Sequence, residues 1–141
     1  MTMVRHPETF KLEIVTPDAT VYSGEVESVI LEGVEGQLTI LPQHTRLTTQ
    51  LVAGEMVVHK AGGDEFLAVG EGLVYITGER VAVVTDMAVA AGNIDEARAE
   101  EARQRAVARL REKLSSEEVA AVNASLAHSL VQLRVKRRPR K

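Results

Sequence analysis

Residues 93–106 read NIDEARAEEARQRA, and the pattern of apolar residues changes where this stretch begins. Before it, short runs alternate between apolar and polar residues, as β-strands with one buried face do. After it, apolar residues recur every three or four positions, as on one face of an α-helix. The change predicts two consecutive parts: a β-domain over residues 1–90, and a helical hairpin with a basic tail over residues 91–141.

The first part is predicted to be an antiparallel β-sandwich or barrel. Phe10, Leu12 and Ile14 alternate with charged residues, and glycine-containing turns at residues 60–64 and 78–80 separate later runs. Because no helical segment separates these runs, we expect neighbouring strands to be antiparallel. The expected strands cover residues 10–14, 26–31, 38–41, 47–51, 56–59, 65–69, 73–77 and 81–85.

Two N-terminal capping patterns predict two helices in the second part. Asn93 is a suitable N-cap with Glu96 at the third helical position, and Ser115 is followed three residues later by Glu118, the capping-box pattern. The loop between the helices is only a few residues long, so the helices should run antiparallel. The expected apolar stripes are Ala99, Ala102, Ala106 and Leu110 on the first helix and Val119, Val122, Leu126, Leu130 and Leu133 on the second.

This hairpin is expected to be only marginally stable alone. Ordering about 40 backbone residues costs on the order of 1–2 kcal/mol each. The second helix offers about five large apolar side chains worth roughly 1.5–3 kcal/mol each when fully buried, and the first offers mainly alanine. We therefore expect the hairpin to dock on a partner surface, either the sandwich or another protein. An element with two docking surfaces can act as a switch.

Composition narrows the class of protein. The chain has 141 residues and no cysteine, which excludes disulfides and thiolate metal sites. It contains neither an 18-residue apolar run nor an N-terminal signal peptide, so we expect a soluble cytoplasmic protein. Residues 1–91 carry 5 Lys and Arg against 13 Asp and Glu, a net charge of −8, whereas residues 92–141 carry 12 against 7, a net charge of +5. This asymmetry suggests two segments with different partners.

Sequence motifs for catalysis are missing. The chain has no P-loop and no nucleophile elbow, and its four histidines (His6, His44, His59 and His128) lack the spacing of metal ligands. We therefore predict no catalytic residue and no metal site. The basic tail over residues 134–141 is either a solvated terminus or a contact for an acidic surface. A freestanding adaptor, or a nucleic-acid-binding protein that uses this tail, is the alternative class, although no aromatic platform lies beside the tail.

Four stretches together resemble one family, the epsilon subunits of bacterial F-type ATP synthases (called delta in mitochondria). They are LEIVTPDATVYSGEVESVILEGVEGQLTILPQHTRLTTQL (residues 12–51), EFLAVGEGLVYITGERVAVVTDMA (65–88), IDEARAEEARQRA (94–106) and SLVQLRV (129–135). The resemblance implies a β-sandwich followed by a helical hairpin. It also implies a non-catalytic central-stalk subunit that contacts the gamma subunit, the c-ring and the alpha/beta catalytic head, and that couples ion translocation to ATP synthesis. Such a subunit meets the cytoplasmic side of the membrane only through the complex, and nucleic acid is not among its partners.

The resemblance further implies regulation by the hairpin. It folds onto the sandwich or extends along gamma into the catalytic head, where it inhibits ATP hydrolysis. Basic residues of the last helix then face an acidic segment of a catalytic β subunit. In this chain those residues are Arg134, Lys136, Arg137 and Arg138.

The resemblance also implies a contact with the c-ring, and the matching residues are Gln37 and His44. Gln37 stands where the family often has Glu. Around them, Thr39 and Gln43 replace glycines of the family pattern, and Arg46 replaces a proline. For His44 the alternative interpretation is a turn histidine that bonds its own backbone.

The resemblance also implies a nucleotide site, whose residues on the first helix match the family pattern and whose residues on the second helix do not. Some family members bind ATP on the folded hairpin through an Ile/Leu-Asp-x-x-Arg-Ala pattern. On a helical wheel three of the polar matches lie within about 80° of one another. Where ATP-binding members carry arginine on the second helix, this chain has His128 and Gln132. ATP is therefore expected as a weak regulatory ligand, and no cofactor is required. The matching residues are Ile94, Asp95, Arg98 and Arg105.

Overall fold

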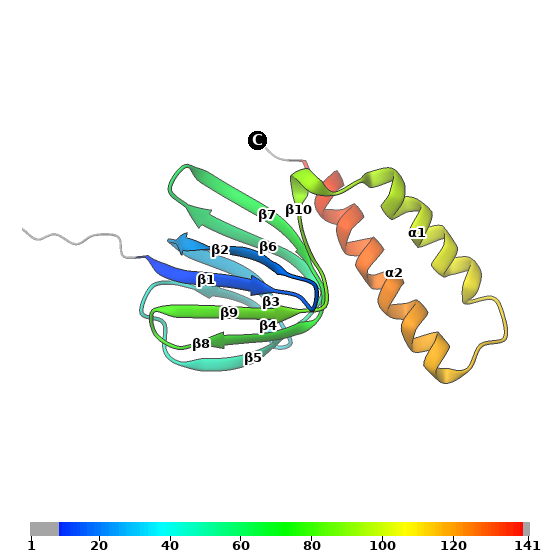
Figure 1. Cartoon of the computed structure of the whole chain (residues 1–141), viewed down its shortest axis with the longest axis horizontal. Coiled ribbons are helices and arrows are strands. Elements are labelled where there is room, and N and C mark those ends of the chain that lie inside the picture. Colours follow the sequence, from blue (N-terminus) through cyan, green and yellow to red (C-terminus); the bar gives the residue numbers. More distant parts are fainter. Residues whose placement is uncertain (1–8, 140–141) are drawn as a thin grey trace, which may run out of the picture.

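Ten strands enclose one apolar core, and a pair of helices lies against one end of them (Figure 1). The computed structural model describes residues 9–139. The predicted sandwich followed by a helical hairpin is confirmed. The strands are β1 Phe10–Val15, β2 Thr20–Val26, β3 Ser28–Gly33, β4 Gly36–Ile40, β5 Leu47–Leu51, β6 Gly54–Lys60, β7 Gly63–Val69, β8 Gly72–Ile76, β9 Arg80–Thr85 and β10 Ala88–Ala90. A 3₁₀ turn, η1 (Ala91–Asn93), leads into α1 (Glu96–Arg109) and α2 (Ser116–Arg137).

The strands are hydrogen-bonded in the order β10-β7-β6-β3-β5-β8-β9-β1-β2, with β4 beside β3. The sheet nearly closes because β2 also lies against β6. Neighbouring strands are antiparallel, as expected, except that β1 and β9 run parallel. The predicted antiparallel sandwich therefore contains one parallel pair. β1 and β9 are joined by the whole intervening domain, so no helical crossover is needed to bring them side by side in the same direction.

The expected strand over residues 26–31 proves to be the junction of two strands. Val26 ends β2 and pairs with Phe10, whereas Val29 lies in β3 and pairs with Val58 and Ile40. Both valines are fully buried although they are three residues apart, an odd spacing that one regular strand cannot accommodate on one face. The chain changes partners at Glu27 between them. β2 and the short β10 were not predicted as strands of their own.

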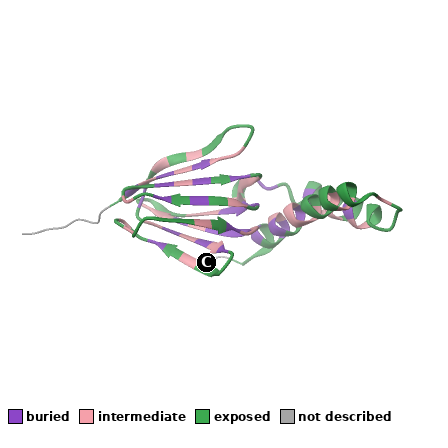
Figure 2. Cartoon of the chain, turned by 90° about the horizontal axis from the view of Figure 1, so that it is seen from below, coloured by how far each residue is buried: buried purple, intermediate pink, exposed green. Residues whose placement is uncertain are grey.

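One continuous core fills the sandwich. Leu12, Ile14, Val29, Val58 and Val83 are completely buried, and they come from four different strands. Figure 2 shows buried and exposed residues alternating along the strands, as expected when each strand presents one face to the core. The sandwich therefore has its own core, independent of the helices.

Capping groups set the start of each helix. Asp95, not Asn93, is the N-cap of α1: its carboxylate accepts the backbone N–H of Arg98 at 3.1 Å. Asn93 belongs to η1, which places the start of the helix two residues later than predicted. The capping box of α2 is confirmed, since the Ser115 hydroxyl accepts the N–H of Glu118 at 3.1 Å and the Glu118 carboxylate accepts the N–H of Ser115 at 2.9 Å.

Helix α2 lies between α1 and the sandwich (Figures 1 and 2). It therefore buries residues on two sides, and the single predicted stripe describes only one of them. Val131 and Val135, outside that stripe, are buried against the sandwich, whereas Leu130, inside it, is 48% exposed. The second apolar side was missed because a helix between two surfaces lacks the one-sided pattern of a surface helix.

The loop between β4 and β5 holds a backbone conformation that favours glycine. Gln43 has φ of 63°, and it is the sole non-glycine residue with positive φ in the described range 9–139. The turn is closed by the His44 N–H, which donates to the carbonyl of Leu41 at 3.2 Å. Glycine has no Cβ and adopts this conformation without the steric cost that Gln43 meets.

Replacing Gln43 with glycine is expected to stabilise the sandwich. The left-handed conformation costs a residue with a side chain about 1–2 kcal/mol, and glycine avoids it while losing roughly 0.5–1 kcal/mol of chain entropy. We expect Gln43→Gly to raise the free energy of unfolding, measured by urea titration, by about 0.5 kcal/mol. The matched control is Gln50→Gly in β5, which should lower it. A decrease of equal size in both variants would contradict the interpretation.

Candidate functional site: the docked hairpin and its cleft

A small apolar patch joins the hairpin to the sandwich. Val131 and Val135 of α2 pack with Ile94 from the linker and Ala68 from β7, and all four are at most 7% exposed. Partly buried residues surround this group: Ala53, Met87, Val89 and Ala91. Ile94, carried over as part of a nucleotide site, thus belongs to the docking patch rather than to a ligand cleft.

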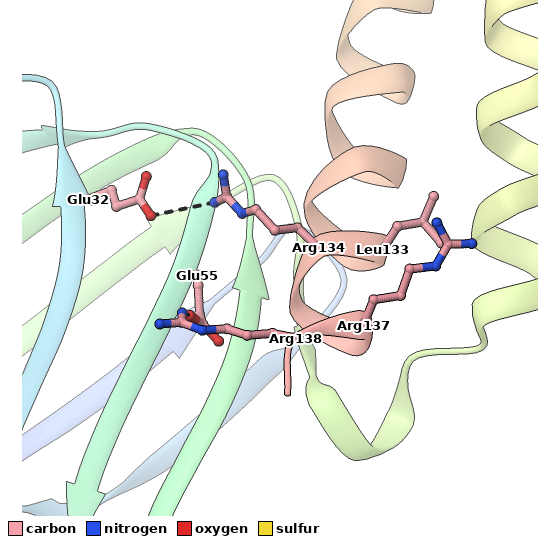
Figure 3. A pocket seen from close by; sticks show the side chains of 6 residues that line it. All are labelled: Glu32, Glu55, Leu133, Arg134, Arg137 and Arg138. Atoms are coloured by element: carbon pink, nitrogen blue, oxygen red, sulfur yellow. Dashed lines mark hydrogen bonds and ion pairs between the residues drawn. The ribbon is translucent and has the colours of Figure 1, made fainter. Parts of the chain in front are cut away.

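Basic residues at the end of α2 contact carboxylates of the sandwich (Figure 3). Arg134 pairs with Glu32 at 3.5 Å, and Arg138 pairs with Glu55, which is only 7% exposed. The Lys136 ammonium donates to the carbonyl of Ala91 at 3.3 Å. The two ion pairs, Arg134–Glu32 and Arg138–Glu55, border a cavity of about 490 Å³ between α2 and the sandwich. The charges predicted to face a partner subunit therefore hold the hairpin down in this compact form.

Arg137 is used within the hairpin. It pairs with Glu96 at 2.5 Å and with Glu100 at 3.3 Å, and so ties the end of α2 to the start of α1. Glu100 also accepts hydrogen bonds from Arg103 and Gln104. The hydrogen bond from Arg103, with smaller contributions from Gln104 and Arg137, lowers the pKa of the Glu100 carboxyl to about 2. The hydrogen bond to Glu96 is the main cause of the raised pKa of Arg137.

A second cavity lies along the two helices. Asp95, Arg98 and Arg105 of α1 and its N-cap line it together with His128 and Gln132 of α2, and its volume is about 520 Å³. The structure thus brings three of the four residues of the predicted nucleotide site to one cleft, facing the two positions where the family pattern is broken.

The electrostatics of this cleft are mixed. The guanidinium groups of Arg98 and Arg105 form no ion pair with any residue in the range 9–139, in contrast to that of Arg103. Against these two cations stand the carboxylates of Asp95, which caps α1, and of Glu101. The polar groups of α2 in the cleft are already engaged: the Ser129 hydroxyl donates to the carbonyl of Ser125 at 3.0 Å, and the Gln132 amide lies 3.7 Å from the Met87 sulfur. Two unpaired arginines suit an anion, and the nearby carboxylates weaken its binding.

The two residues of the predicted ring contact lie at opposite ends of β4. Gln37 is the second residue of that strand, beside the turn from β3, and is exposed. His44 lies in the loop that follows the strand, where its Nδ1 is 2.7 Å from the carbonyl oxygen of Thr45. The imidazole ring thus contacts the backbone of the next residue, which resembles the alternative of a turn histidine that bonds its own backbone. A surface that includes both residues would have to run the whole length of β4.

The acidic residues that receive the hairpin were not singled out from the sequence. Glu32, Glu55 and Asp86 lie in or next to strands of the sandwich, and each faces a basic residue of α2. The signal for them was the opposite charge of the two parts of the chain. We expected that asymmetry to reflect different partners. Some of the acidic residues of the sandwich instead pair with residues of α2 in the same chain.

No three potential metal-binding side chains come together in the described part of the chain. Neither α1 nor α2 combines the length and apolar character that a membrane-spanning helix needs.

Two family models match consecutive parts of this architecture. The β-sandwich domain of the ATP synthase delta/epsilon chain matches residues 9–91, and the long α-helix domain of the same chain matches residues 93–137. The sandwich with its helical appendage therefore defines a class of ATP synthase subunit. The chain belongs to the ATP synthase epsilon-chain family, as its sequence relatives show.

Those relatives are similar along nearly their whole length. The ATP synthase epsilon chain of Dehalococcoides mccartyi is 42% identical over 93% of this chain and 94% of its own length. That of Halorhodospira halophila is 37% identical over 89% and 91%. Among solved structures, a chain of the Euglena gracilis mitochondrial ATP synthase has a TM-score of 0.69 at 20% identity, over 88% of this chain and 79% of that chain. The structural likeness shows the fold.

The low pKa of Glu100 leads to a prediction about acid stability. An ionised Glu100 stabilises the folded hairpin above its ordinary pKa of 4.5, and this contribution is lost as the pH falls from about 4.5 towards 2. We expect Glu100→Gln to lower the thermal midpoint of the helical circular-dichroism signal at pH 7 and to have little effect near pH 2. The adjacent exposed Glu101→Gln is the control and should show no such pH-dependent difference. An effect of Glu100→Gln that is equal at all pH values would contradict the assignment.

Proposed function

We propose that this chain is a central-stalk rotor subunit of an F-type ATP synthase, without an active site of its own. In this proposal it couples ion translocation through the membrane ring to ATP synthesis in the catalytic head. Its partners are the gamma subunit, the c-ring and the alpha/beta head, and it lies on the cytoplasmic side of the membrane as a peripheral part of the complex. The match of both family domains over residues 9–137 is the observation that supports this proposal.

We further propose that the hairpin inhibits ATP hydrolysis when it leaves the sandwich. Arg134 and its partner Glu32 are both exposed, at 56% and 39% of their side-chain surface. Ion pairs at exposed sites contribute only about 0–1 kcal/mol because water and salt screen them. An acidic segment of a catalytic β subunit can therefore take the place of Glu32 at small cost, whereas releasing Arg138 leaves the buried carboxylate of Glu55 without this partner and costs more. Lys136 and Arg137 are also exposed, and they complete the basic surface that would face this segment.

For the ring contact, we propose the exposed outer edge of the sandwich around Gln37 and His44. The part of β4 from Gln37 to Ile40 is roughly 10 Å long at the usual rise per strand residue, and the turn that leads to His44 follows it. If both residues contact the ring, the contact surface on this subunit must therefore extend along β4. The alternative of a nucleic-acid adaptor gains no support from Arg134, Arg137 and Arg138, which contact the sandwich and α1. The last two basic residues of the tail, Arg140 and Lys141, lie outside the described residues.

As a regulatory ligand, we propose ATP bound weakly in the cleft between α1 and α2. Arg98 and Arg105 supply two unpaired cations for phosphate oxygens. Gln132 and an uncharged His128 supply no fixed positive charge from the opposite helix. Each missing charge-assisted hydrogen bond costs roughly 1.5–3 kcal/mol, which corresponds to one or two decades in affinity.

Removing residues from Ser115 onward is expected to raise ATP hydrolysis by the assembled complex. The sandwich has its own core and should still co-purify with gamma and the catalytic head, which serves as the control for assembly. The measurement is the hydrolysis rate of complexes with equal content of the full and the shortened chain. Unchanged hydrolysis would exclude an inhibitory hairpin, and failure of the full chain to co-purify would exclude the stalk assignment.

Calorimetry with ATP and Mg²⁺ tests the cleft. The unmodified chain is expected to bind weakly or undetectably, and Gln132→Arg should tighten binding by about one to two decades. The control is Asn123→Arg, which adds the same charge to α2 away from this cleft. A low-micromolar dissociation constant for the unmodified chain, or equal effects of the two arginines, would refute the proposed deficit.

A further inference from the structure

Two carboxylates of the sandwich lie close together beneath the end of α2. Glu32 belongs to β3 and Glu55 to β6, two strands that pair with each other, and both line the cavity of about 490 Å³ under the helix (Figure 3). Gly54, the residue before Glu55, makes room for the neighbouring carboxylate: a Cβ at Gly54 would lie 2.7 Å from the Cδ of Glu32. Because like charges on neighbouring strands destabilise a sheet, cations from outside the sheet are needed to offset their repulsion.

These cations come from α2, and each meets one carboxylate. Arg134 pairs with Glu32, and Arg138, the C-cap of α2, pairs with Glu55. The two pairs differ in burial. Both side chains of the Arg134–Glu32 pair are more than one-third exposed, whereas the side chain of Glu55 is only 6% exposed. The first pair can therefore exchange its partner for water at small cost, and the second cannot.

Glu55 is buried on the side of the sheet that α2 covers. The register of β6 and β7 sets Glu55 directly opposite Ala68, so both residues are on the same face of the sheet. Ala68 belongs to the apolar patch formed with Val131 and Val135 of α2. The docked hairpin therefore holds Glu55 beneath it, and departure of the hairpin opens this face of the sheet to water.

The effect of Glu55 on docking thus depends on Arg138. With Arg138 in place, the carboxylate that α2 covers has a charged partner that compensates for its burial. Without Arg138, docking of α2 would bury the same carboxylate without this partner, which costs more than leaving it in water. Glu55 therefore accepts the docked hairpin in the first case and opposes it in the second.

We propose that Glu55 is a gate that allows the hairpin to dock on the sandwich only when Arg138 is seated against it. A partner that captures Arg138 then does more than compete for one contact, because Glu55 opposes the return of α2 for as long as Arg138 is held elsewhere. The Arg134–Glu32 pair has no such effect, because both of its members are exposed. The inference rests on the proposed ability of the hairpin to leave the sandwich, and it assigns the control of that movement to one buried carboxylate.

The full chain allows a direct test because it has no cysteine of its own. Donor and acceptor dyes on Glu35→Cys, in the turn between β3 and β4, and Lys113→Cys, in the loop between the helices, report docking by energy transfer. Every sample also carries Val131→Ala, which weakens the apolar patch so that both forms are populated. At neutral pH we expect Arg138→Gln to lower the docked-to-open ratio roughly tenfold, because docking then buries Glu55 without this partner.

The decisive variant combines two substitutions. Glu55→Gln added to Arg138→Gln should raise the ratio again, because a neutral amide is less costly to bury than a carboxylate. In the chain that keeps Arg138, the same Glu55→Gln should give no such rise. A simple attraction between the two side chains predicts no rise in either chain.

The exposed pair provides the matched control. Arg134→Gln should lower the ratio by no more than about fivefold, and Glu32→Gln added to it should give no rise. A ratio that stays low when Glu55→Gln is added to Arg138→Gln overturns the gate. So does an equal rise in the chain that keeps Arg138 or in the control pair.

Mobility of the hairpin is tested separately by Val131→Asp in place of Val131→Ala. The buried carboxylate that this substitution adds disrupts the apolar patch and should open the hairpin. If energy transfer falls in this variant, the three outcomes that overturn the gate leave the movable hairpin intact. Energy transfer that stays high in Val131→Asp overturns the movable hairpin, and the gate with it.

Discussion

The docking of the hairpin depends on one small apolar contact, formed by Val131 and Val135 of α2 against Ala68 and Ile94. The sandwich has a separate core and does not need this contact, whereas α2 reaches the sandwich through it. Each buried valine contributes at most about 1.5–3 kcal/mol. The contact is thus large enough to position the helix and small enough to be broken without unfolding the sandwich. Charged groups surround it and set its orientation.

The charged groups have a different role from the apolar ones. An apolar side chain gains by leaving water wherever it is buried, but a basic side chain is satisfied by a carboxylate on any surface. Arg134 and Arg138 meet Glu32 and Glu55 here. In the proposed inhibited complex they would meet an acidic segment of a partner. Arg137 instead holds α1 and α2 together through Glu96 and Glu100, an arrangement that could persist if the hairpin moved as a unit.

Local patterns were sufficient to predict much of this structure. Alternation predicted most strands, and the Ser115–Glu118 box was found as expected because capping involves neighbours in sequence. What depended on distant contacts was missed: the parallel β1–β9 pair, and the second buried side of α2. The same limit applies to the site. Residues on one helix were correctly expected to share a face, whereas nothing local indicates that Glu55 or Asp86 would lie beneath α2.

The position of α2 between two surfaces has a consequence for how the subunit can change. One side of this helix, which carries the buried Leu133, faces α1 and determines how well the hairpin holds together (Figure 3). The other side, around Val131 and Val135, determines how tightly the hairpin is held by the sandwich. Substitutions on the two sides therefore alter two properties separately. Selection could adjust the time that the hairpin spends docked without altering its integrity, and a single helix would carry both adjustments.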